Sequence, residues 1–155
     1  MAVYLVRHGK AGSRRDWSGP DRERPLTDGG QDQARALVTL LADQRLAAVV
    51  SSPYLRCVQT VEPLAAKVGV RVEESPALAE GADLEATLEL VRRLAPDGAV
   101  LCTHGDVIPA VLDALATQDG ADVGPEWRWA KGSVWELEGA HGRIVTARYV
   151  PPPAA

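Results

Sequence analysis

The amino-acid sequence predicts an α/β fold: a three-layer sandwich in which helices cover both faces of a mainly parallel central sheet. Short apolar runs rich in strand-forming residues alternate along the chain with segments in which apolar residues recur at helical spacing. Strands that alternate with helices are joined by right-handed crossovers, which make the strands parallel and place helices on both faces of the sheet. The chain has 155 residues, a length typical of one compact domain. We therefore expect a single domain over residues 1–150.

The first predicted strand, residues 2–6, is a continuous apolar run that ends at Arg7-His8-Gly9, a pattern typical of a strand buried on both faces. Residues 10–25 lack periodicity and contain glycines, prolines and many charges, so we expect a long loop. The same patterns predict the later elements, and glycines between the last two strands indicate a hairpin. We expect helices from about residue 27, over 54–68, over 84–94 and after residue 105, strands over 46–50, 70–73, 99–103, 134–137 and 143–150, and a frayed tail over 151–155.

Composition and charge exclude several classes of function. The formal net charge of −4 gives no overall attraction to nucleic acid, so an anionic ligand would have to be bound by a local cluster of cations. Cys57 and Cys102 form no CxxC pair, and neither is followed six residues later by the arginine of a cysteine-dependent phosphate-binding loop. No apolar run is long enough for a signal-peptide core or a membrane span. We therefore expect a cytoplasmic protein with buried, reduced thiols that binds neither nucleic acid nor membrane.

Two histidines follow predicted strands at the point where each strand ends. In an open α/β sheet, ligands bind beyond the carboxyl ends of the strands, and both Arg7-His8-Gly9 and Thr103-His104-Gly105 are expected at such ends. A third strand is followed by Ser51-Ser52-Pro53, and the chain then carries Arg56 into the first turn of the next helix. The sequence therefore predicts that an imidazole pair and two guanidinium groups lie at one edge of the sheet.

These side chains suit the binding and transfer of a phosphoryl group. A neutral imidazole can attack phosphorus, and a hydrogen bond from its other nitrogen to the carbonyl of the following glycine would fix the attacking nitrogen of His8. The planar guanidiniums of Arg7 and Arg56 match phosphoryl oxygens and would stabilise charge in the transition state. His104 would donate a further hydrogen bond, and the backbone N–H groups that open the helix after Gly105 would add positive potential.

Each of these residues has a simpler interpretation when it is taken alone. His104 could be a structural histidine, and Arg56 could be a solvated helix residue or a partner of Glu62. A metal site built from His8, His104 and a carboxylate is disfavoured, because the neighbouring arginines would repel a divalent cation. We therefore expect neither a metal nor another cofactor.

Four ordered blocks of the sequence resemble the histidine phosphatase superfamily, which includes the phosphoglycerate mutases, and within it the short bacterial phosphohistidine phosphatases of the SixA type. The similarity extends over nearly the whole chain. It implies a phosphoglycerate mutase-like fold, a phosphorylated nucleophile at His8, a phosphate pocket formed by Arg7, Arg56 and His104, and catalysis without a metal. The blocks are Leu5-Val6-Arg7-His8-Gly9-Lys10-Ala11; Arg24-Pro25-Leu26-Thr27 with Gly30, Gln33 and Ala34; Ser51-Ser52-Pro53 with Arg56, Gln59 and Thr60; and Thr103-His104-Gly105.

The general acid is the open part of this expectation. Many superfamily members supply a carboxylate from the segment after the third strand, where this chain has Glu80, our candidate. Asp106, next to His104, is a second candidate, and Glu80 could instead be a solvated loop residue. The short phosphohistidine phosphatases often lack a clear acid, since a phosphoramidate leaves more readily than an alkoxide and depends less on the roughly 10²- to 10⁴-fold gain from acid catalysis. A retained Glu80 would favour phosphate monoesters.

The expected substrates follow from the loops around this edge. Short connections after the later strands and one longer basic loop predict an open pocket with a cationic rim. Such a pocket could receive a phosphohistidine projecting from a phosphorylated protein, our leading hypothesis, or a small phosphorylated substrate such as a nucleotide or a sugar phosphate. A non-catalytic phosphate-binding module is the third hypothesis. The basic loop carries Lys10, Arg14, Arg15, Arg22 and Arg24.

The four tryptophans have more ordinary expected roles. Trp17, in the basic loop, could stack on a nucleotide base, but anchoring of the loop is the simpler interpretation. Trp127, Trp129 and Trp135 should pack near the closing hairpin.

Overall fold

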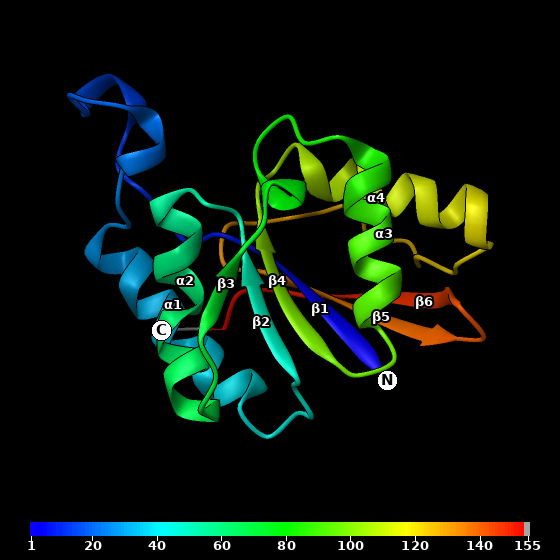
Figure 1. Cartoon of the computed structure of the whole chain (residues 1–155). Helices are drawn as coiled ribbons and strands as arrows, with labels where there is room; N and C mark the ends of the chain where they lie inside the picture. The colour runs from blue at the N-terminus through cyan, green and yellow to red at the C-terminus, as the bar shows by residue number, and fades with distance from the viewer. Residues whose placement is uncertain (154–155) are drawn as a thin grey trace.

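A computed structural model describes residues 1–153 of the chain, and within this range one sheet of six strands forms the centre of the molecule (Figure 1). The strands are β1 (Ala2–Arg7), β2 (Ala48–Ser51), β3 (Val72–Glu74), β4 (Ala99–Thr103), β5 (Val134–Ala140) and β6 (Arg143–Val150). Their order in the sheet is β3-β2-β4-β1-β5-β6. The first four strands in this order pair in parallel, whereas β5 is antiparallel to both β1 and β6. The predicted mainly parallel sheet with a closing hairpin is confirmed.

Helices cover both faces of this sheet, as expected for a three-layer sandwich (Figure 1). They are α1 (Asp28–Leu41), α2 (Leu55–Val68), α3 (Leu84–Leu94) and α4 (Val107–Ala114), and α4 continues into a π-helical turn over Leu115–Asp119. Leu37 of α1 and Leu64 of α2 belong to the core cluster on one face. Leu88 of α3 and Ile108 of α4 belong to the cluster on the other face. Three-residue 3-10 turns occur at Arg14–Asp16, Asp21–Glu23 and Pro76–Leu78.

The central strand β1 explains why the first apolar run is continuous. Val3 and Leu5 pack into the cluster beneath α3 and α4, whereas Tyr4 and Val6 pack into the cluster beneath α1 and α2. Alternate side chains of a strand point to opposite faces, so a strand covered on both sides needs apolar residues at every position. Full burial of each such side chain contributes about 1.5–3 kcal/mol, which holds the strand that carries His8 rigidly in the sheet.

The structure differs from the predicted strand over residues 70–73, because β3 begins only at Val72. Gly69 follows α2 in the left-handed conformation, with φ of 81°. The N–H of Val70 then donates to the carbonyl of Ala65 at 3.0 Å. This is the geometry by which a glycine closes a helix. Residues 69 and 70 therefore complete the helix end, and the strand starts two residues later than the apolar pattern indicates.

The closing hairpin is also longer than predicted. β5 continues through Gly139 to Ala140, with a shift of register between Glu138 and Gly139. The turn consists of His141 and Gly142, whose φ values are 56° and 80°. Positive φ at both central residues is typical of the two-residue turn that matches the twist of the flanking strands.

Little of the predicted tail can be compared with the structure. Residues 151–153 are in neither a helix nor a strand. Residues 154 and 155 of the predicted frayed tail lie outside the described residues. Across residues 1–153, no helix combines the length and the apolar character needed to cross a membrane.

The carboxyl ends of three parallel strands lie next to one another at one edge of the sheet. Arg7, the last residue of β1, pairs with Thr103, the last residue of β4, and Ser51 of β2 pairs with Cys102 of β4. The N–H of His8 donates to the carbonyl of Thr103 at 3.1 Å. The residues that follow β1, β2 and β4 are therefore brought together, although the end of β1 at Arg7 lies 44 residues before that of β2 at Ser51, and the end of β4 at Thr103 lies a further 52 residues on.

Candidate active site

His8 lies one residue beyond β1, and its ring is held by its own backbone. Nδ1 lies 2.8 Å from the carbonyl oxygen of Gly9, to which it donates. His8 is only 6% exposed, and this burial lowers its pKa to about 4. The hydrogen bond to the Gly9 carbonyl raises the pKa in part, and the positive charge of Arg56 lowers it further. The ring is therefore neutral at neutral pH, and Nε2 carries the lone pair.

The glycine beside His8 is required by close packing against α1. A Cβ atom on Gly9 would lie 3.0 Å from Oε1 of Gln33 and 3.1 Å from the carbonyl oxygen of Gly30. A Cβ atom on Gly30 would in turn lie 2.0 Å from the carbonyl oxygen of Lys10. The segment after β1 therefore packs closely against the first turn of α1, and a side chain at either glycine position would meet backbone or side-chain atoms of the other segment.

Arg7 extends from the end of β1 toward the turn after β4. Its Nη1 donates to the carbonyl of Trp129 at 2.8 Å, while its buried Nε has no partner among the described residues. Gly105 makes room for this side chain, because a Cβ atom there would lie 2.7 Å from Nη2 and 2.8 Å from Cζ of Arg7. The absence of a side chain at Gly105 therefore leaves space for the guanidinium of Arg7. This role is separate from the expected donation of backbone N–H groups to a phosphoryl group.

Arg56 is completely buried in the first turn of α2. Its Nη1 donates to the backbone carbonyl of Asp21 at 3.0 Å, and its Nη2 lies 3.2 Å from Oδ2 of Asp21 and 3.1 Å from Oε1 of Glu80. The guanidinium also lies over the ring of Tyr54, 4.9 Å from the ring centre. The interpretations of Arg56 as a solvated residue or as a partner of Glu62 are therefore wrong.

His104 follows β4 and is 1% exposed. Its ring centre lies 5.4 Å from that of His8 and 4.7 Å from that of Tyr54, both edge to face. Nε2 lies 2.8 Å from Oγ of Ser52, and Nδ1 lies 3.8 Å from Oε1 of Glu80. Burial, with the proximity of His8 and Arg56, lowers the pKa of His104 to about 3. This ring is also neutral at neutral pH.

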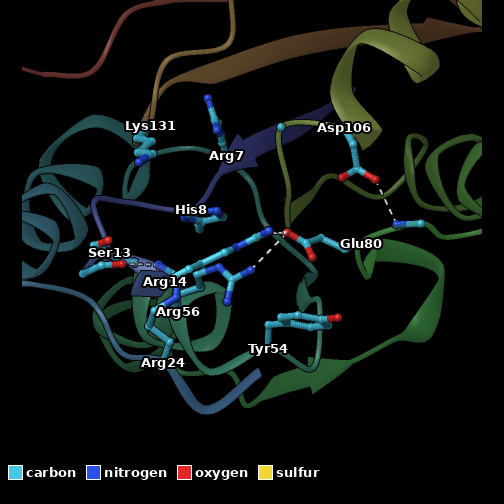
Figure 2. Close-up of a pocket in the computed structure, with 14 residues that line it drawn as sticks. Arg7, His8, Ser13, Arg14, Arg24, Tyr54, Arg56, Glu80, Asp106 and Lys131 are labelled. Carbon is cyan, nitrogen blue, oxygen red and sulfur yellow. Dashed lines mark hydrogen bonds and ion pairs between the residues drawn. The ribbon is translucent and has the colours of Figure 1, made fainter. Parts of the chain in front are cut away.

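The two candidate acids lie at the same site but have different partners (Figure 2). Oε1 of Glu80 is 2.7 Å from Nη2 of Arg14 and 3.1 Å from Nη2 of Arg56. Asp106 instead accepts a hydrogen bond from the N–H of Gly81 at 2.9 Å. Glu80 is thus a partnered residue rather than a solvated loop glutamate, and Asp106 contacts the backbone just after it.

Apart from His104, which is buried beside Glu80, these residues line a cavity of about 770 Å³ that is rich in positive charge. Its lining combines an imidazole ring, two carboxylates and several cations from segments that lie far apart in the chain (Figure 2). Such a site can bind a phosphoryl group by charge-assisted hydrogen bonds and offer it a neutral imidazole. The charged and histidine residues of the lining are Arg7, His8, Arg14, Arg24, Arg56, Glu80, Asp106 and Lys131.

The loop over residues 10–25, which the sequence predicted as a basic rim of the pocket, supplies one wall of the cavity. Arg24 is 7% exposed, its Nη1 donates to the carbonyl of Gly12, and its Nε lies 3.0 Å from Oδ1 of Asp21. The position of Arg24 directly before Pro25-Leu26-Thr27, which leads into α1, is the signal that singles it out from the other loop arginines.

Lys131 is a residue of the cavity that the sequence analysis missed. Its carbonyl accepts a hydrogen bond from Nε2 of Gln33 at 3.0 Å, and the N–H of Gly132 donates to the carbonyls of Arg7 and His8, both at 3.1 Å. Burial and the nearby cations, Arg7 foremost, lower the pKa of Lys131. Nothing in the local sequence before β5 indicates this position, because contact with β1 creates it.

The tryptophans lie outside the cavity wall. Nε1 of Trp17 donates to the carbonyl of Pro20 at 2.9 Å, which matches the loop-anchoring interpretation. Trp135 of β5 is fully buried, and Trp129 packs against the same core cluster. Trp127 packs edge to face on Trp129 but is 52% exposed.

In the part of the chain that the structure describes, no three His, Cys, Asp or Glu side chains are grouped so that they could hold a metal ion. The two histidines of the site instead lie near the positive charge of Arg56, which lowers the pKa of both rings. The arrangement is one of anion-binding donors around a neutral imidazole.

Similarity to characterised proteins agrees with this geometry. The chain is 38% identical over 157 aligned residues to an 8-oxo-(d)GTP phosphatase of Mycolicibacterium smegmatis, and the alignment covers 97% of this chain and 48% of that protein. It is 30% identical over 125 residues to the phosphohistidine phosphatase SixA of Escherichia coli K12, which covers 79% of this chain and 64% of that protein. The chain thus spans about half to two thirds of the length of these relatives.

A solved structure shows the same fold. The protein histidine phosphatase SixA complexed with tungstate superimposes with a TM-score of 0.76 over 97% of this chain and 95% of that one, at 20% identity. Residues 3–87, more than half of the chain, match the family model described as the histidine phosphatase superfamily (branch 1). Fold, site geometry and sequence similarity therefore agree that the chain belongs to the histidine phosphatase superfamily.

Proposed function

We propose that this chain is a metal-independent phosphatase in which His8 takes a phosphoryl group from the substrate and passes it to water. The observation that carries the proposal is the orientation of His8. Its Nδ1 donates to the carbonyl of Gly9 at 2.8 Å, which leaves Nε2 as the atom with the lone pair. The low pKa of about 4 keeps this nitrogen unprotonated at neutral pH, as a nucleophile requires.

The reaction then has two steps. In the first, Nε2 of His8 attacks phosphorus, a P–N bond forms, and the bond between phosphorus and the leaving atom breaks. The leaving atom takes up a proton, which Glu80 would supply to an oxygen and solvent to a nitrogen. In the second step, water attacks the phosphohistidine, the P–N bond breaks with its electron pair returning to Nε2, and phosphate leaves with the oxygen and one proton of the water. The other proton of the water replaces the one that the leaving atom took up. Arg7, Arg56 and His104 would donate to the phosphoryl oxygens in both steps, where charge develops.

The leading substrate class is a phosphohistidine on a protein. The resemblance to SixA of E. coli, which is named as a phosphohistidine phosphatase, supports this choice. A cavity of about 770 Å³ is larger than one phosphoryl group, so a protein-borne imidazole could enter with it. The leaving nitrogen of a phosphoramidate needs less help from a general acid than an alkoxide does, so this reaction does not depend on proton donation by Glu80.

Phosphate monoesters or nucleotides form the second candidate class, and Glu80 favours it. Its carboxylate lines the cavity and lies beside His104, where a leaving oxygen would need a proton. The similarity to the 8-oxo-(d)GTP phosphatase supports small phosphorylated substrates as well. We assign the acid role to Glu80 rather than Asp106, because Asp106 accepts from the N–H of Gly81 and thereby holds the loop that follows Glu80.

Rapid quenching tests the mechanism. Brief incubation with ³²P-labelled substrate should leave acid-labile, base-stable phosphate on the wild-type protein and none on His8→Ala. The matched control is His141→Ala, since His141 lies in the β5–β6 turn and is exposed. Label that persists in His8→Ala would exclude His8 as the nucleophile, and tight phosphate binding without turnover would favour a non-catalytic binding module.

A substrate panel separates the two substrate classes. Wild type, Glu80→Gln and Asp106→Asn should be compared on phosphohistidine-containing protein, a nucleotide and a sugar phosphate. A phosphohistidine phosphatase should act on the protein in all three forms. Loss of ester hydrolysis confined to Glu80→Gln would support its acid role, and turnover of esters alone would overturn the leading substrate.

We further propose that the protein acts in the cytoplasm, without nucleic-acid or membrane partners. Two buried cysteines that remain free and the formal net charge of −4 support this proposal. Fractionation of cells that produce the tagged protein would test it.

A further inference from the structure

Ser52 touches the side of His104 that faces away from Glu80. It follows β2 directly, and its Oγ lies 2.8 Å from Nε2 of His104. Both residues are buried, with exposed fractions of 0% and 1%. The N–H of Tyr54 donates to the same Oγ at 3.2 Å. The hydroxyl is therefore fixed between a backbone donor and the imidazole ring.

Either Oγ of Ser52 or Nε2 of His104 donates in this hydrogen bond, and the other partners of the hydroxyl decide which one does. Oγ already accepts the N–H of Tyr54, and its own O–H needs an acceptor. Among the described residues, Nε2 of His104 is the nitrogen or oxygen within reach that can accept it. If Nε2 carried a proton, the buried hydroxyl would be left without an acceptor, which is rare in native structures. Ser52 is therefore the donor, and Nε2 of His104 carries the lone pair.

Cys57 lies on the same nitrogen. Its Sγ is 3.5 Å from Nε2 of His104 and 3.8 Å from the carbonyl of Thr103, and the residue is fully buried. The single S–H proton of Cys57 donates to that carbonyl, so the thiol is not a second donor to Nε2, and its sulfur is only a weak acceptor. The shorter contact with the hydroxyl of Ser52 therefore decides which ring nitrogen carries the proton.

The other nitrogen, Nδ1, lies on the side of the ring toward Glu80, whose side chain lines the cavity. Nδ1 of His104 is buried, has no hydrogen-bond partner among residues 1–153, and lies 3.8 Å from Oε1 of Glu80. Because a neutral imidazole has one N–H, a proton kept off Nε2 resides on Nδ1. A proton there turns the ring into a donor for an incoming oxyanion, whereas a lone pair there would repel it.

We propose that Ser52 is a positioning residue that holds His104 in its Nδ1–H tautomer, so that His104 donates a hydrogen bond to a phosphoryl oxygen. This role of His104 rests on the proposed phosphatase function, since Nδ1–H has an acceptor only when a phosphoryl group is bound in the cavity. Ser52 acts through His104 and does not itself contact the substrate.

Kinetics of three serine variants test the role. Ser52→Ala should lower kcat/KM by about 10- to 100-fold, the scale for loss of a residue that orients a functional side chain. This loss is smaller than the ~10²- to 10³-fold expected when a group that donates directly to the oxyanion is removed. Ser52→Thr, which restores a hydroxyl, should recover most of the loss. Ser51→Ala is the matched control, because Ser51 is equally buried but donates to the backbone carbonyl of Ser52 at 2.8 Å. Equal losses in Ser51→Ala and Ser52→Ala would reduce the role of Ser52 to packing.

The tautomer itself is read by ¹⁵N NMR of ring-labelled histidine, assigned with His104→Asn. Wild type and Ser51→Ala should show an Nδ1–H ring at His104, and Ser52→Ala should shift the population toward Nε2–H. An Nε2–H ring in wild type, or an unchanged ring in Ser52→Ala, would overturn the proposal. If Ser52→Ala does not fold, the wild-type spectrum decides alone. If His104 carries its proton on Nδ1 but the protein has no phosphatase activity, the tautomer assignment holds and the proposed function is wrong.

Discussion

Nη2 of Arg56 lies 3.1 Å from Oε1 of Glu80, and the same oxygen lies 2.7 Å from Nη2 of Arg14. Nδ1 of His104 is the next group, at 3.8 Å. A carboxylate oxygen thus occupies a point surrounded by donors that suit a phosphoryl oxygen. An incoming phosphoryl group and Glu80 would compete for these donors. The ion pair of Arg56 with Glu80 therefore belongs to the free protein, and substrate binding should release Glu80.

Removal of this competing charge should tighten the binding of phosphate. Glu80→Gln should bind orthovanadate or inorganic phosphate roughly three- to tenfold more tightly than wild type, the equivalent of about 1 kcal/mol for one displaced ion pair. Isothermal titration calorimetry measures the change. Glu62→Gln is the control, because it removes the same charge from an exposed position on α2. Weaker binding in Glu80→Gln would mean that Glu80 does not compete with the anion.

Loss of the Arg56 fork should slow the chemical step. Arg56→Ala should lower kcat/KM by on the order of 10²- to 10³-fold, as expected when one preorganised donor to transition-state charge is removed. Arg56→Lys should recover only part of this, since an ammonium group cannot reproduce the fork that joins Asp21 and Glu80. Steady-state kinetics measure both, with exposed Arg35→Ala of α1 as the control. A loss of only twofold in Arg56→Ala would place this arginine outside the phosphate pocket.

A single methyl group at Gly105 should displace Arg7. The Cβ atom of Gly105→Ala would lie 2.7 Å from Nη2 of Arg7, so the guanidinium would have to move. We expect kcat/KM to fall toward the value of Arg7→Ala, while the far-ultraviolet circular dichroism spectrum is retained. Gly29→Ala is the control, because its Cβ atom would meet ordinary contacts at 3.7 Å and beyond. Wild-type activity in Gly105→Ala would show that the position of Arg7 is not critical.

The acid limb of the pH profile should lie well below the range of an ordinary histidine. Burial lowers the pKa of His8 from 6.5 to about 4, so its ring stays neutral until the pH approaches that value. kcat/KM, corrected for ionisation of a phosphate monoester near pH 6, should be level at pH 5–7 and fall below about pH 4. An acid limb centred near pH 6.5 would contradict a nucleophilic role for the buried ring of His8.

The same histidines should make stability depend on pH. In the unfolded chain they bind protons below about pH 6.5, whereas the folded protein resists protonation of His8 until about 4 and of His104 until about 3. The unfolded state therefore holds more protons in this window, and the free energy of unfolding falls as the pH drops, by up to about 1.4 kcal/mol per pH unit for each ring. Urea unfolding at several pH values should show a shallower slope for His8→Asn. Equal slopes would contradict this linkage.

Much of the site could be predicted because it sits at the ends of sequence-local patterns. An apolar run that ends in Arg7-His8-Gly9 predicts a buried strand with a histidine at its carboxyl end, and the same holds for Thr103-His104-Gly105. Parallel strands put such ends at one edge of the sheet, so the convergence of these histidines followed from topology alone. Their catalytic roles and the single domain over residues 1–150 stay predictions.

Other parts depended on contacts between distant segments. The loop residue Asp21 holds Arg56, the residue before β5, Lys131, lines the cavity, and Ser52 contacts His104. No periodicity or spacing marks Asp21 or Lys131, and the block that contains Ser52 does not reveal its contact with His104, because loop paths are set by packing rather than by local preference. Even the start of β3 was decided by how Gly69 closes α2.

The sequence by itself determined the order of strands and helices, the superfamily, and the nucleophile candidate His8, since these follow from local patterns of apolar and motif residues. Only the tertiary structure decided the proton positions and charges of the site. Burial makes both rings neutral, the carbonyl of Gly9 orients His8, and Glu80 pairs with Arg56. Desolvation and hydrogen-bond geometry depend on which distant groups surround an atom, and that is a property of the folded chain.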